Sequence, residues 1–375
     1  MIMVFSLKVL TEVLGPDGYG LYAYSQAWIA LGLIFTLNGY SKTISGTVAK
    51  GFHGDVRIST RQSIKYALAG QILFFVGLTF LSHASQISDE KKYLLIVCGL
   101  VFPFYHICQR AYQILMGLGR FKDVFFLKVF AGIGLITWYL SFSHLDRNLF
   151  LCSILVIPVL CDGLSFVYAL KCLGNSKIDQ AFHAHSKHVS NTGIFVQILN
   201  SSVFIAIEYL FGLETLAVLH VAKRLSNQGA TFVKFILRPF ALSLTGANSD
   251  YHEMLISSYF KFICLGVVLY FGYTAGLYAA GPVILSREML ESLDYAAIFG
   301  AVIIFLPLFF MLQSFLLFEK KKEIYRKTMM FEQLILCLFY FILLPVYGAI
   351  VVGLAPICLI VTKSLYILLT LKLAR

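Results

Sequence analysis

The sequence predicts an all-α polytopic membrane protein with about twelve transmembrane helices in two six-helix lobes. Of its 375 residues, 59% are hydrophobic and only 13% are charged, against roughly 45–50% and 25% in soluble chains. The apolar residues also come in blocks of about twenty, the length that a helix needs to cross a bilayer. No polar stretch is long enough to form a soluble domain.

Helical spans follow one another along the whole chain. The apolar stretch 1–14 is too short to cross a bilayer, so we interpret it as most of a first helix whose beginning is missing from this sequence. Residues 15–18 (GPDG) then predict a tight turn. Further spans are expected at about 20–40, 64–82, 93–116, 124–142, 149–171, 192–211, 212–247, 257–280, 295–318, 328–346 and 349–371.

The longest polar connector, 172–191, divides the chain into an N-terminal lobe, 1–171, and a C-terminal lobe, 192–375. We expect the connector to be a solvated cytoplasmic loop. Its His183, His185 and His188 invite comparison with a metal site. However, no carboxylate or cysteine accompanies them, so no metal site is predicted. The eight cysteines form no CxxC pair, and they predict neither a disulfide framework nor a zinc site.

The distribution of basic residues predicts the orientation of the chain. A net charge of +11 is compatible with nucleic-acid binding, but basic residues in short loops between spans indicate membrane orientation instead, and no nucleic-acid partner is expected. The outer loops hold only Lys91, Lys92, Arg147 and Arg287. The other side holds Lys42, Lys50, Arg57, Arg61, Arg120, Lys122, Lys128, Lys171, Lys177, Lys187, Lys320, Lys321, Lys322, Arg326, Lys327, Lys372 and Arg375. The positive-inside rule therefore places both termini in the cytoplasm.

The two halves resemble each other weakly, as two repeats. Residues 15–22 (GPDGYGLY) match 212–219 (GLETLAVL) at an offset of 197, and the basic turn 119–122 matches 319–322 at an offset of 200. An even number of spans in each repeat makes the repeats parallel, and transport sites in such proteins lie between the halves near mid-membrane.

The expected span 212–247 is unusual because it carries four cations, Lys223, Arg224, Lys234 and Arg238. Six polar residues recur at helical spacing over about 27 Å of this helix. They are His220, Arg224, Asn227, Thr231, Lys234 and Arg238. Each Lys or Arg at the bilayer centre costs at least about 2.5–3.5 kcal/mol. We therefore expect this polar stripe to face water or protein. For Lys234 and Arg238, snorkelling to the cytoplasmic interface is the alternative.

Several short motifs are distributed along the chain: residues 14–23 (LGPDGYGLYA), the turn Gly119-Arg120, residues 214–225, Pro239 and residues 345–353. Together they resemble the polysaccharide-export, O-antigen flippase branch of the multidrug/oligosaccharidyl-lipid/polysaccharide (MOP) flippase superfamily. The resemblance in span order covers essentially the whole chain. It departs from the family pattern at the short first helix, at Ala217 in place of a glycine, and at the acidic residue of span seven, where Glu208 is the nearest.

The resemblance implies two lobes around a V-shaped cavity, alternating access, and a polyprenyl-pyrophosphate-linked oligosaccharide as cargo, flipped from the cytoplasmic to the periplasmic leaflet of the bacterial inner membrane. Membrane lipids, glycosyltransferases and a glycan polymerase are the implied partners. No cofactor is expected apart from coupling to H⁺ or Na⁺.

This cargo suggests roles for individual residues. A pyrophosphate requires cations in low dielectric, for which Arg224 and Lys223 are the first candidates, followed by Lys234, Lys8 and Arg238. Four amides are candidates for bonding sugar hydroxyls: Gln26, Asn200, Asn227 and Gln228. Glu208 either couples ion movement or neutralises a cation, and we favour the second. Arg110, with His106 and Gln109, is interpreted as an interfacial anchor.

Two rival functions remain. A multidrug or cation antiporter of the same superfamily would favour buried carboxylates, whereas the charge buried here is mainly positive. A membrane-embedded glycan polymerase would usually present a long outer loop with catalytic acids or arginines, whereas the largest outer loop, about 281–294, holds only Arg287, Glu288, Glu291 and Asp294.

Overall fold

The computed structural model is almost entirely helical, and the residues that it describes form no strand. It describes residues 2–36, 44–45, 47–84, 87–174, 177–178, 180–244, 251–318 and 322–373. The chain folds into two compact units, Met1–Ala206 and Ile207–Arg375. The second unit begins within the expected seventh span, so residues 192–206 belong to the first unit.

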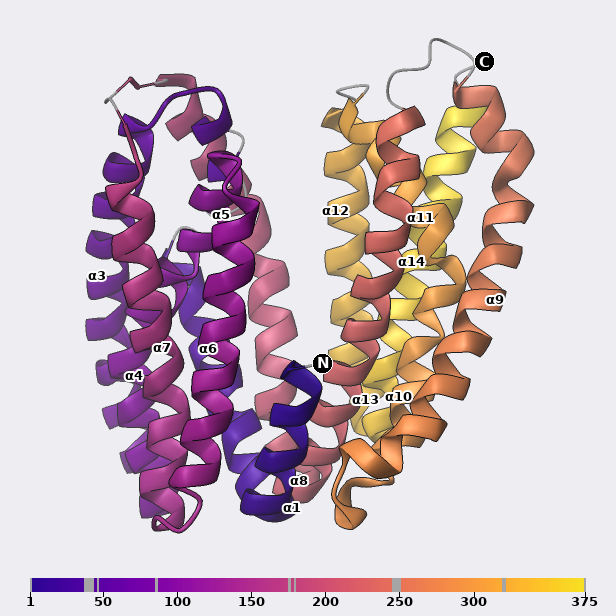
Figure 1. The fold of residues 1–375 in the computed structure, drawn as a ribbon. Coiled ribbons are helices and arrows are strands. Elements are labelled where there is room, and N and C mark those ends of the chain that lie inside the picture. Colours follow the sequence, from indigo (N-terminus) through magenta and orange to yellow (C-terminus); the bar gives the residue numbers. More distant parts are fainter. Residues whose placement is uncertain are drawn as a thin grey trace. The chain divides into compact units, whose positions relative to one another are not determined.

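The first unit is a bundle of long helices (Figure 1). In chain order it contains α1 (Ile2–Gly32), the 3₁₀ turn η1 (Leu33–Thr36), α3 (Gly54–Ala84), α4 (Asp89–Cys108), α5 (Arg110–Gly117), α6 (Phe121–Ser141), α7 (Arg147–Lys171) and the start of α8 (Gln180–Leu244). The N-termini of two helices are capped by the residues that precede them. Ser88 accepts a bond from the backbone N–H of Lys91 before α4, and Asp146 accepts one from Asn148 before α7.

The second unit continues from α8 into a further set of helices. They are α9 (Tyr251–Ile284), the 3₁₀ turn η2 (Arg287–Met289), α10 (Ser292–Gly300), α11 (Val302–Phe318), α12 (Lys322–Cys337), the π-helical segment η3 (Leu338–Leu343), α13 (Leu344–Tyr347), the 3₁₀ turn η4 (Gly348–Ile350) and α14 (Val351–Leu373).

Eight helical stretches of the described chain are long and apolar enough to cross a membrane. Two of them, 194–234 and 330–370, have 41 residues each, which is roughly twice the length that a bilayer core requires. Each is interrupted by a glycine with positive φ, Gly212 or Gly348, and α1 is broken in the same way at Gly15. These stretches therefore hold two spans each, and the prediction of an all-α polytopic chain with about twelve spans is confirmed.

The breaks at Gly15 and Gly212 have the same backbone conformation. Gly15 has φ 63° and ψ −178°, and Gly212 has φ 86° and ψ 174°, a region that is essentially restricted to glycine. The two glycines stand 197 residues apart, the offset expected for the repeat. At the second matched turn, Gly119 also has positive φ (72°), while residues 319–321 lie outside the described part of the chain.

Two expected loops are helical instead. Arg57 and Arg61 lie on the first turns of α3, because Asp55, Val56 and Ser59 are buried at helical spacing and extend the packed face of this helix beyond its apolar part. Likewise, α8 begins at Gln180, within the connector. The backbone of the three connector histidines is therefore helical, and the expectation of a loop there was wrong.

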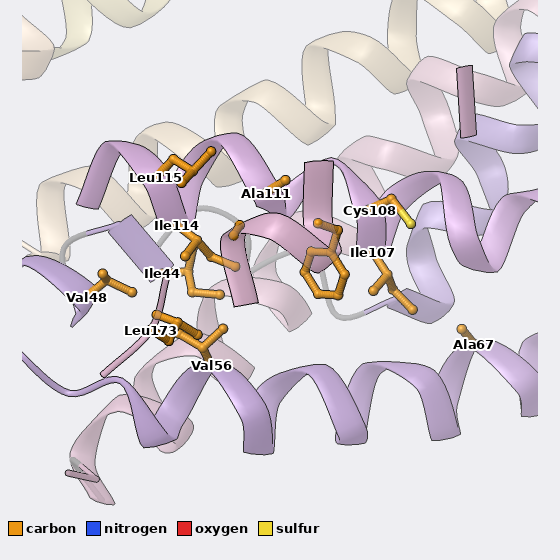
Figure 2. Packing of buried hydrophobic residues seen from close by; sticks show 12 residues of the cluster. Ile44, Val48, Val56, Ala67, Ile107, Cys108, Ala111, Ile114, Leu115 and Leu173 are labelled. Carbon is orange, nitrogen blue, oxygen red and sulfur yellow. The ribbon is translucent and has the colours of Figure 1, made fainter. Parts of the chain in front are cut away.

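The core of the first unit lies where α3, α4, α5 and α7 meet. In Figure 2, Ile44, Val56, Ile114 and Leu173 point toward one another, and Ala111 supplies a small surface between neighbouring helices. All five are buried, with at most 7% of their surface exposed. Close van der Waals packing of these branched side chains therefore fixes the arrangement of the four helices.

Close helix contacts at glycines organise the second unit. A Cβ atom on Gly266 of α9 would lie 1.9 Å from the backbone oxygen of Ile304 on α11, and one on Gly353 of α14 would lie 1.9 Å from the Phe299 ring. Small residues at such crossings let helices pack tightly where the hydrophobic effect gives no net drive. These contacts hold α9, α10, α11 and α14 together.

Replacing Gly212 with alanine should destabilise the protein, because a Cβ atom is strained in this backbone region by about 1–3 kcal/mol. The cause is the backbone, since no atom lies within 4 Å of the added Cβ. We expect a lower midpoint of thermal unfolding for the purified protein in detergent. Gly272→Ala, a helical position on α9 that is equally open, is the matched control and should leave the midpoint unchanged or raise it. Equal midpoints for both variants would contradict the strain.

Candidate substrate-binding helix

The second half of α8, from the break at Gly212 to Leu244, carries the polar stripe predicted from the sequence. One of its faces is packed inside the second unit. Val233 and Leu237 are buried against Val302, Ile303 and Leu306 of α11. This contact fixes the rotation of the helix about its own axis.

Gly229 brings the same half of α8 close to α9. A Cβ atom on Gly229 would lie 2.6 Å from the ring of Tyr273, and one on Gly300 of α10 would lie 2.3 Å from that ring. The Tyr273 ring therefore fits between two glycines, and its hydroxyl donates a hydrogen bond of 3.3 Å to the carbonyl of Ala296. A larger residue at 229 would push α8 away from α9.

The stripe lies on the opposite side of α8 from Gly229. Asn227, Thr231 and Lys234 are exposed, and His220 and Arg224 are partly buried. The Thr231 hydroxyl donates to the carbonyl of Asn227 (2.7 Å), which partly satisfies this hydroxyl within its own helix. Along about two turns, a helix long and apolar enough to span a membrane thus exposes amide, hydroxyl and ammonium groups together.

The remaining candidates on this helix differ in exposure. Lys223 is partly buried beside the stripe. Gln228 is partly buried as well, and its amide nitrogen has no hydrogen-bond partner in the described part of the chain. A buried amide without a partner loses about 1–3 kcal/mol of solvation, which favours a ligand or water at this position. The side chain of Arg238 lies outside the described residues.

The candidates in the first unit are Lys8, Gln26 and Asn200. Lys8 pairs with Glu12 one turn along the same helix, at 3.8 Å. Gln26 and Asn200 are partly buried. The polar contact between their helices is made instead by Gln197, whose amide donates to the carbonyl of Ala30 (3.1 Å). Sequence analysis missed Gln197, which nothing in its spacing distinguishes from other amides.

Glu208, the candidate for ion coupling, is partly buried on α8 in the first residues of the second unit. It lies about one turn before the break at Gly212, near the end of its span. No group of histidine, cysteine or carboxylate side chains in the described chain could hold a metal ion. The side chains of His183, His185 and His188 lie outside the described residues.

Arg110 is buried inside the first unit, so its interpretation as an interfacial anchor was wrong. Only 1% of its surface is exposed. Its guanidinium donates to the carbonyl of Thr36 (2.7 Å) and to the hydroxyl of Ser63 (2.8 Å), while His106 bonds the carbonyl of Ile29 (2.9 Å). Two of these bonds satisfy backbone carbonyl groups near the point where α1 ends and η1 begins. The cation therefore stabilises a helix end.

A second buried cation, Lys363 of α14, was not recognised from the sequence. Its ammonium is paired with the carboxylate of Glu332 on α12, and both side chains are mostly buried, at 9% and 15% exposure. The two residues are 31 positions apart, so no local spacing links them. Only the turn at Gly348, which folds α14 back along α12, brings them together.

No protein-family model matches this chain, and no curated protein matches it. Solved structures do. An inward-facing multidrug resistance MATE family transporter of the MOP superfamily aligns with a TM-score of 0.65 at 12% identity, covering 99% of this chain and 95% of that one. The lipid II flippase MurJ, in an inward closed conformation, aligns with a TM-score of 0.66 at 17% identity, covering 99% and 86%.

A further match is a MOP superfamily transporter from Pyrococcus furiosus, described by the reverse polarity of its binding pocket, which suggests a different function. It aligns with a TM-score of 0.59 at 12% identity, covering 98% of this chain and 87% of that one. At these identities the likeness shows the fold. This chain has the helical fold of MOP superfamily transporters, and the matched structures named here are transporters and a flippase, not enzymes.

Proposed function

We propose that this chain flips a polyprenyl-pyrophosphate-linked oligosaccharide from the cytoplasmic to the periplasmic leaflet of a bacterial inner membrane. It would do so by alternating access, in the biosynthesis of a surface polysaccharide such as O-antigen, capsule or exopolysaccharide. The observation that carries the proposal is the polar stripe on α8, which stands opposite the face packed on α9 and α11.

The depth of the cations suits a charged headgroup that crosses the membrane. If the turn at Gly212 marks the outer edge of the bilayer, Arg224 lies about 18 Å inward and Lys234 about 33 Å inward. Arg224 is then near mid-membrane, while Lys234 stands at the cytoplasmic edge, where cargo would enter. The planar guanidinium of Arg224 offers two parallel N–H donors, a geometry that matches phosphate oxygens.

The rest of the stripe suits sugars. Asn227 and Thr231 are exposed, and the amide nitrogen of Gln228 has no partner among the described residues. Amides and hydroxyls can replace water around sugar hydroxyl groups at little net cost. The prenyl tail needs no protein site, since it can stay in lipid. The fold similarity to a lipid II flippase is consistent with such a lipid-linked cargo.

A multidrug antiporter is the rival, because a multidrug resistance transporter shares this fold. Coulomb repulsion disfavours it, since two unit charges 4 Å apart interact by about 4 kcal/mol at an effective dielectric of 20, and a cationic drug would meet Arg224 and Lys234. A glycan polymerase has less support, because only the short η2 turn separates α9 from α10, and this is the connection that the sequence predicts to be the largest outer loop.

Arg224→Ala should abolish flipping. We expect surface glycan to disappear from cells that depend on this chain, while the protein remains inserted and abundant. Arg224→Lys, which keeps the charge but loses the two-pronged geometry, should retain part of the activity. The measurement is the amount of surface polysaccharide, normalised to protein in the membrane. Arg287→Ala, which removes an exposed cation of η2, is the control and should behave as wild type. Normal glycan in Arg224→Ala would argue against the pyrophosphate contact.

Neighbouring positions on α8 should differ in access to water. Thr231 and Phe232 are both exposed, but they lie about 100° apart around the helix. In a background without native cysteines, Thr231→Cys should react with a membrane-impermeant thiol reagent, and Phe232→Cys should not. Equal labelling, or labelling of position 232 alone, would mean that the stripe does not face water.

A further inference from the structure

The pair formed by Lys363 and Glu332 sets the second unit apart. Among ion pairs of described residues, Lys8–Glu12 and Glu90–Arg147 have at least one partner that is half exposed, whereas both partners of Glu332–Lys363 are mostly buried. The pair joins α12 to α14 inside the membrane-spanning stretch 330–370. Ionisable residues at such depth are costly and mark ion pathways more often than simple packing.

The two partners lie at the same depth. Glu332 precedes the turn at Gly348 by 16 residues, and Lys363 follows it by 15. At about 1.5 Å per residue, both stand roughly 22–24 Å from that turn, within the cytoplasmic half of a core about 30 Å thick. The pair is therefore positioned where a proton could exchange with one side of the membrane more readily than with the other.

The surroundings favour a pair that can separate. The Lys363 ammonium lies 5.7 Å from the centroid of the Phe309 ring on α11, a contact that stabilises a cation without neutralising it. On the same span as Glu332, η3 (Leu338–Leu343) is π-helical, a rare conformation that is frequent at functional sites. A π-helical segment holds one extra residue compared with an α-helix. If η3 changed to an α-helix, α12 would rotate by about 100° relative to α13.

We propose that the Glu332–Lys363 pair is the proton-binding site that drives the second unit, a proposal that rests on the transport function proposed above. In one state the carboxylate accepts hydrogen bonds from the Lys363 ammonium. In the other, a proton from water bonds to a Glu332 carboxylate oxygen, the N–H···O contact breaks, and the ammonium stays charged against Phe309. The site changes from net neutral to a charge of +1, and the proton returns to water when the pair forms again.

Few other titratable groups face this pair in the described chain. Tyr340 of η3 is buried and interacts electrostatically with Glu332. Tyr366 of α14 is one turn from Lys363, where its ring packs on Phe331 of α12 at 4.9 Å. On α11, the apolar Phe309 contacts the Lys363 ammonium. A tyrosine hydroxyl ordinarily titrates far above neutral pH, which leaves the Glu332 carboxylate as the proton acceptor of this proposal.

Glu208 is the competing proton site. It stands near the end of its span, about one turn from the Gly212 break. At that depth a carboxylate can reach interfacial water, and its protonation need not accompany a change between transport states. Glu332 is instead paired with Lys363, so its protonation would break a contact between α12 and α14.

The experiment compares flipping with and without an imposed pH gradient. A fluorescent polyprenyl-pyrophosphate-linked disaccharide is the probe, in proteoliposomes of phosphatidylethanolamine and phosphatidylglycerol. The informative variant is Glu332→Gln/Lys363→Met, because removing both charges avoids the penalty of one unpaired buried charge. We expect the gradient to accelerate flipping by wild type, and this acceleration to be lost in the double variant.

Two further measurements make the outcome unambiguous. Acidification raises the infrared absorbance of every carboxyl group that becomes protonated, so the measurement is the difference between the acid-induced spectra of wild type and the double variant. We expect a carboxyl band in this difference that belongs to Glu332, whereas a pair that never takes up a proton would leave no band there. Glu90→Gln/Arg147→Met, which removes the outer ion pair of the first unit, and Glu208→Gln should both keep the acceleration. Acceleration that persists in the double variant, or is lost in Glu208→Gln alone, would overturn the proposal. Wild type that does not flip the probe at all would refute the transport function instead.

Discussion

Hydrocarbon offers no partner to a backbone N–H, a carbonyl or a charge, and this constraint explains most of the architecture. Every backbone group at membrane depth must be satisfied within its own segment, which leaves helices as the solution for this sequence. Reversals must then be compact, and the chain makes them at glycines whose backbone conformation other residues avoid, at Gly15, Gly212 and Gly348. Such turns allow two spans to follow one another with almost no loop.

The same constraint accounts for three different placements of positive charge. Arg110 is surrounded by protein and bonded to a carbonyl and a hydroxyl. Lys363 is surrounded by protein and bonded to a carboxylate. Along α8, by contrast, Lys234 is exposed next to Asn227 and Thr231. A buried cation that is bonded to neutral groups favours one fixed arrangement. A cation that is paired with a carboxylate can lose this partner when the carboxylate is protonated. Exposed polar groups can bind a ligand.

The fold was largely predictable because hydrophobic blocks, basic loops and glycine turns are local signals. The 197-residue offset between Gly15 and Gly212 even anticipated a shared backbone conformation. Boundaries were less predictable, since Arg57 and Arg61 are polar and yet continue α3, whose buried face carries Asp55 and Ser59. Helix length there is decided by tertiary packing, which a hydropathy pattern does not report.

Polar groups that share a face were predictable only where one helix carries the pattern. The stripe on α8 could be read from spacing, because its members share a single helix. The bonds of Arg110 to Thr36 and Ser63 and the pairing of Lys363 with Glu332 join different helices. A single sequence contains no signal for such contacts. It therefore does not distinguish whether an isolated arginine or lysine within a span is an interfacial anchor, a substrate-binding residue or a partner in an ion pair.

The two units differ in the contacts that their charged side chains make. In the first unit, Asp162 accepts a bond of 2.7 Å from Tyr112, whose ring faces Lys128 at 5.0 Å. Arg147 bonds Glu90 at 2.6 Å, and both residues lie in the first turns of their helices, α7 and α4. These contacts tie neighbouring helices of one bundle and involve no π-helical segment. The second unit combines the exposed stripe of α8 with a buried ion pair beside η3. A proton taken up by Glu332, as proposed above, would break the contact between α12 and α14, so a change of charge at this pair would act directly on the packing of the second unit.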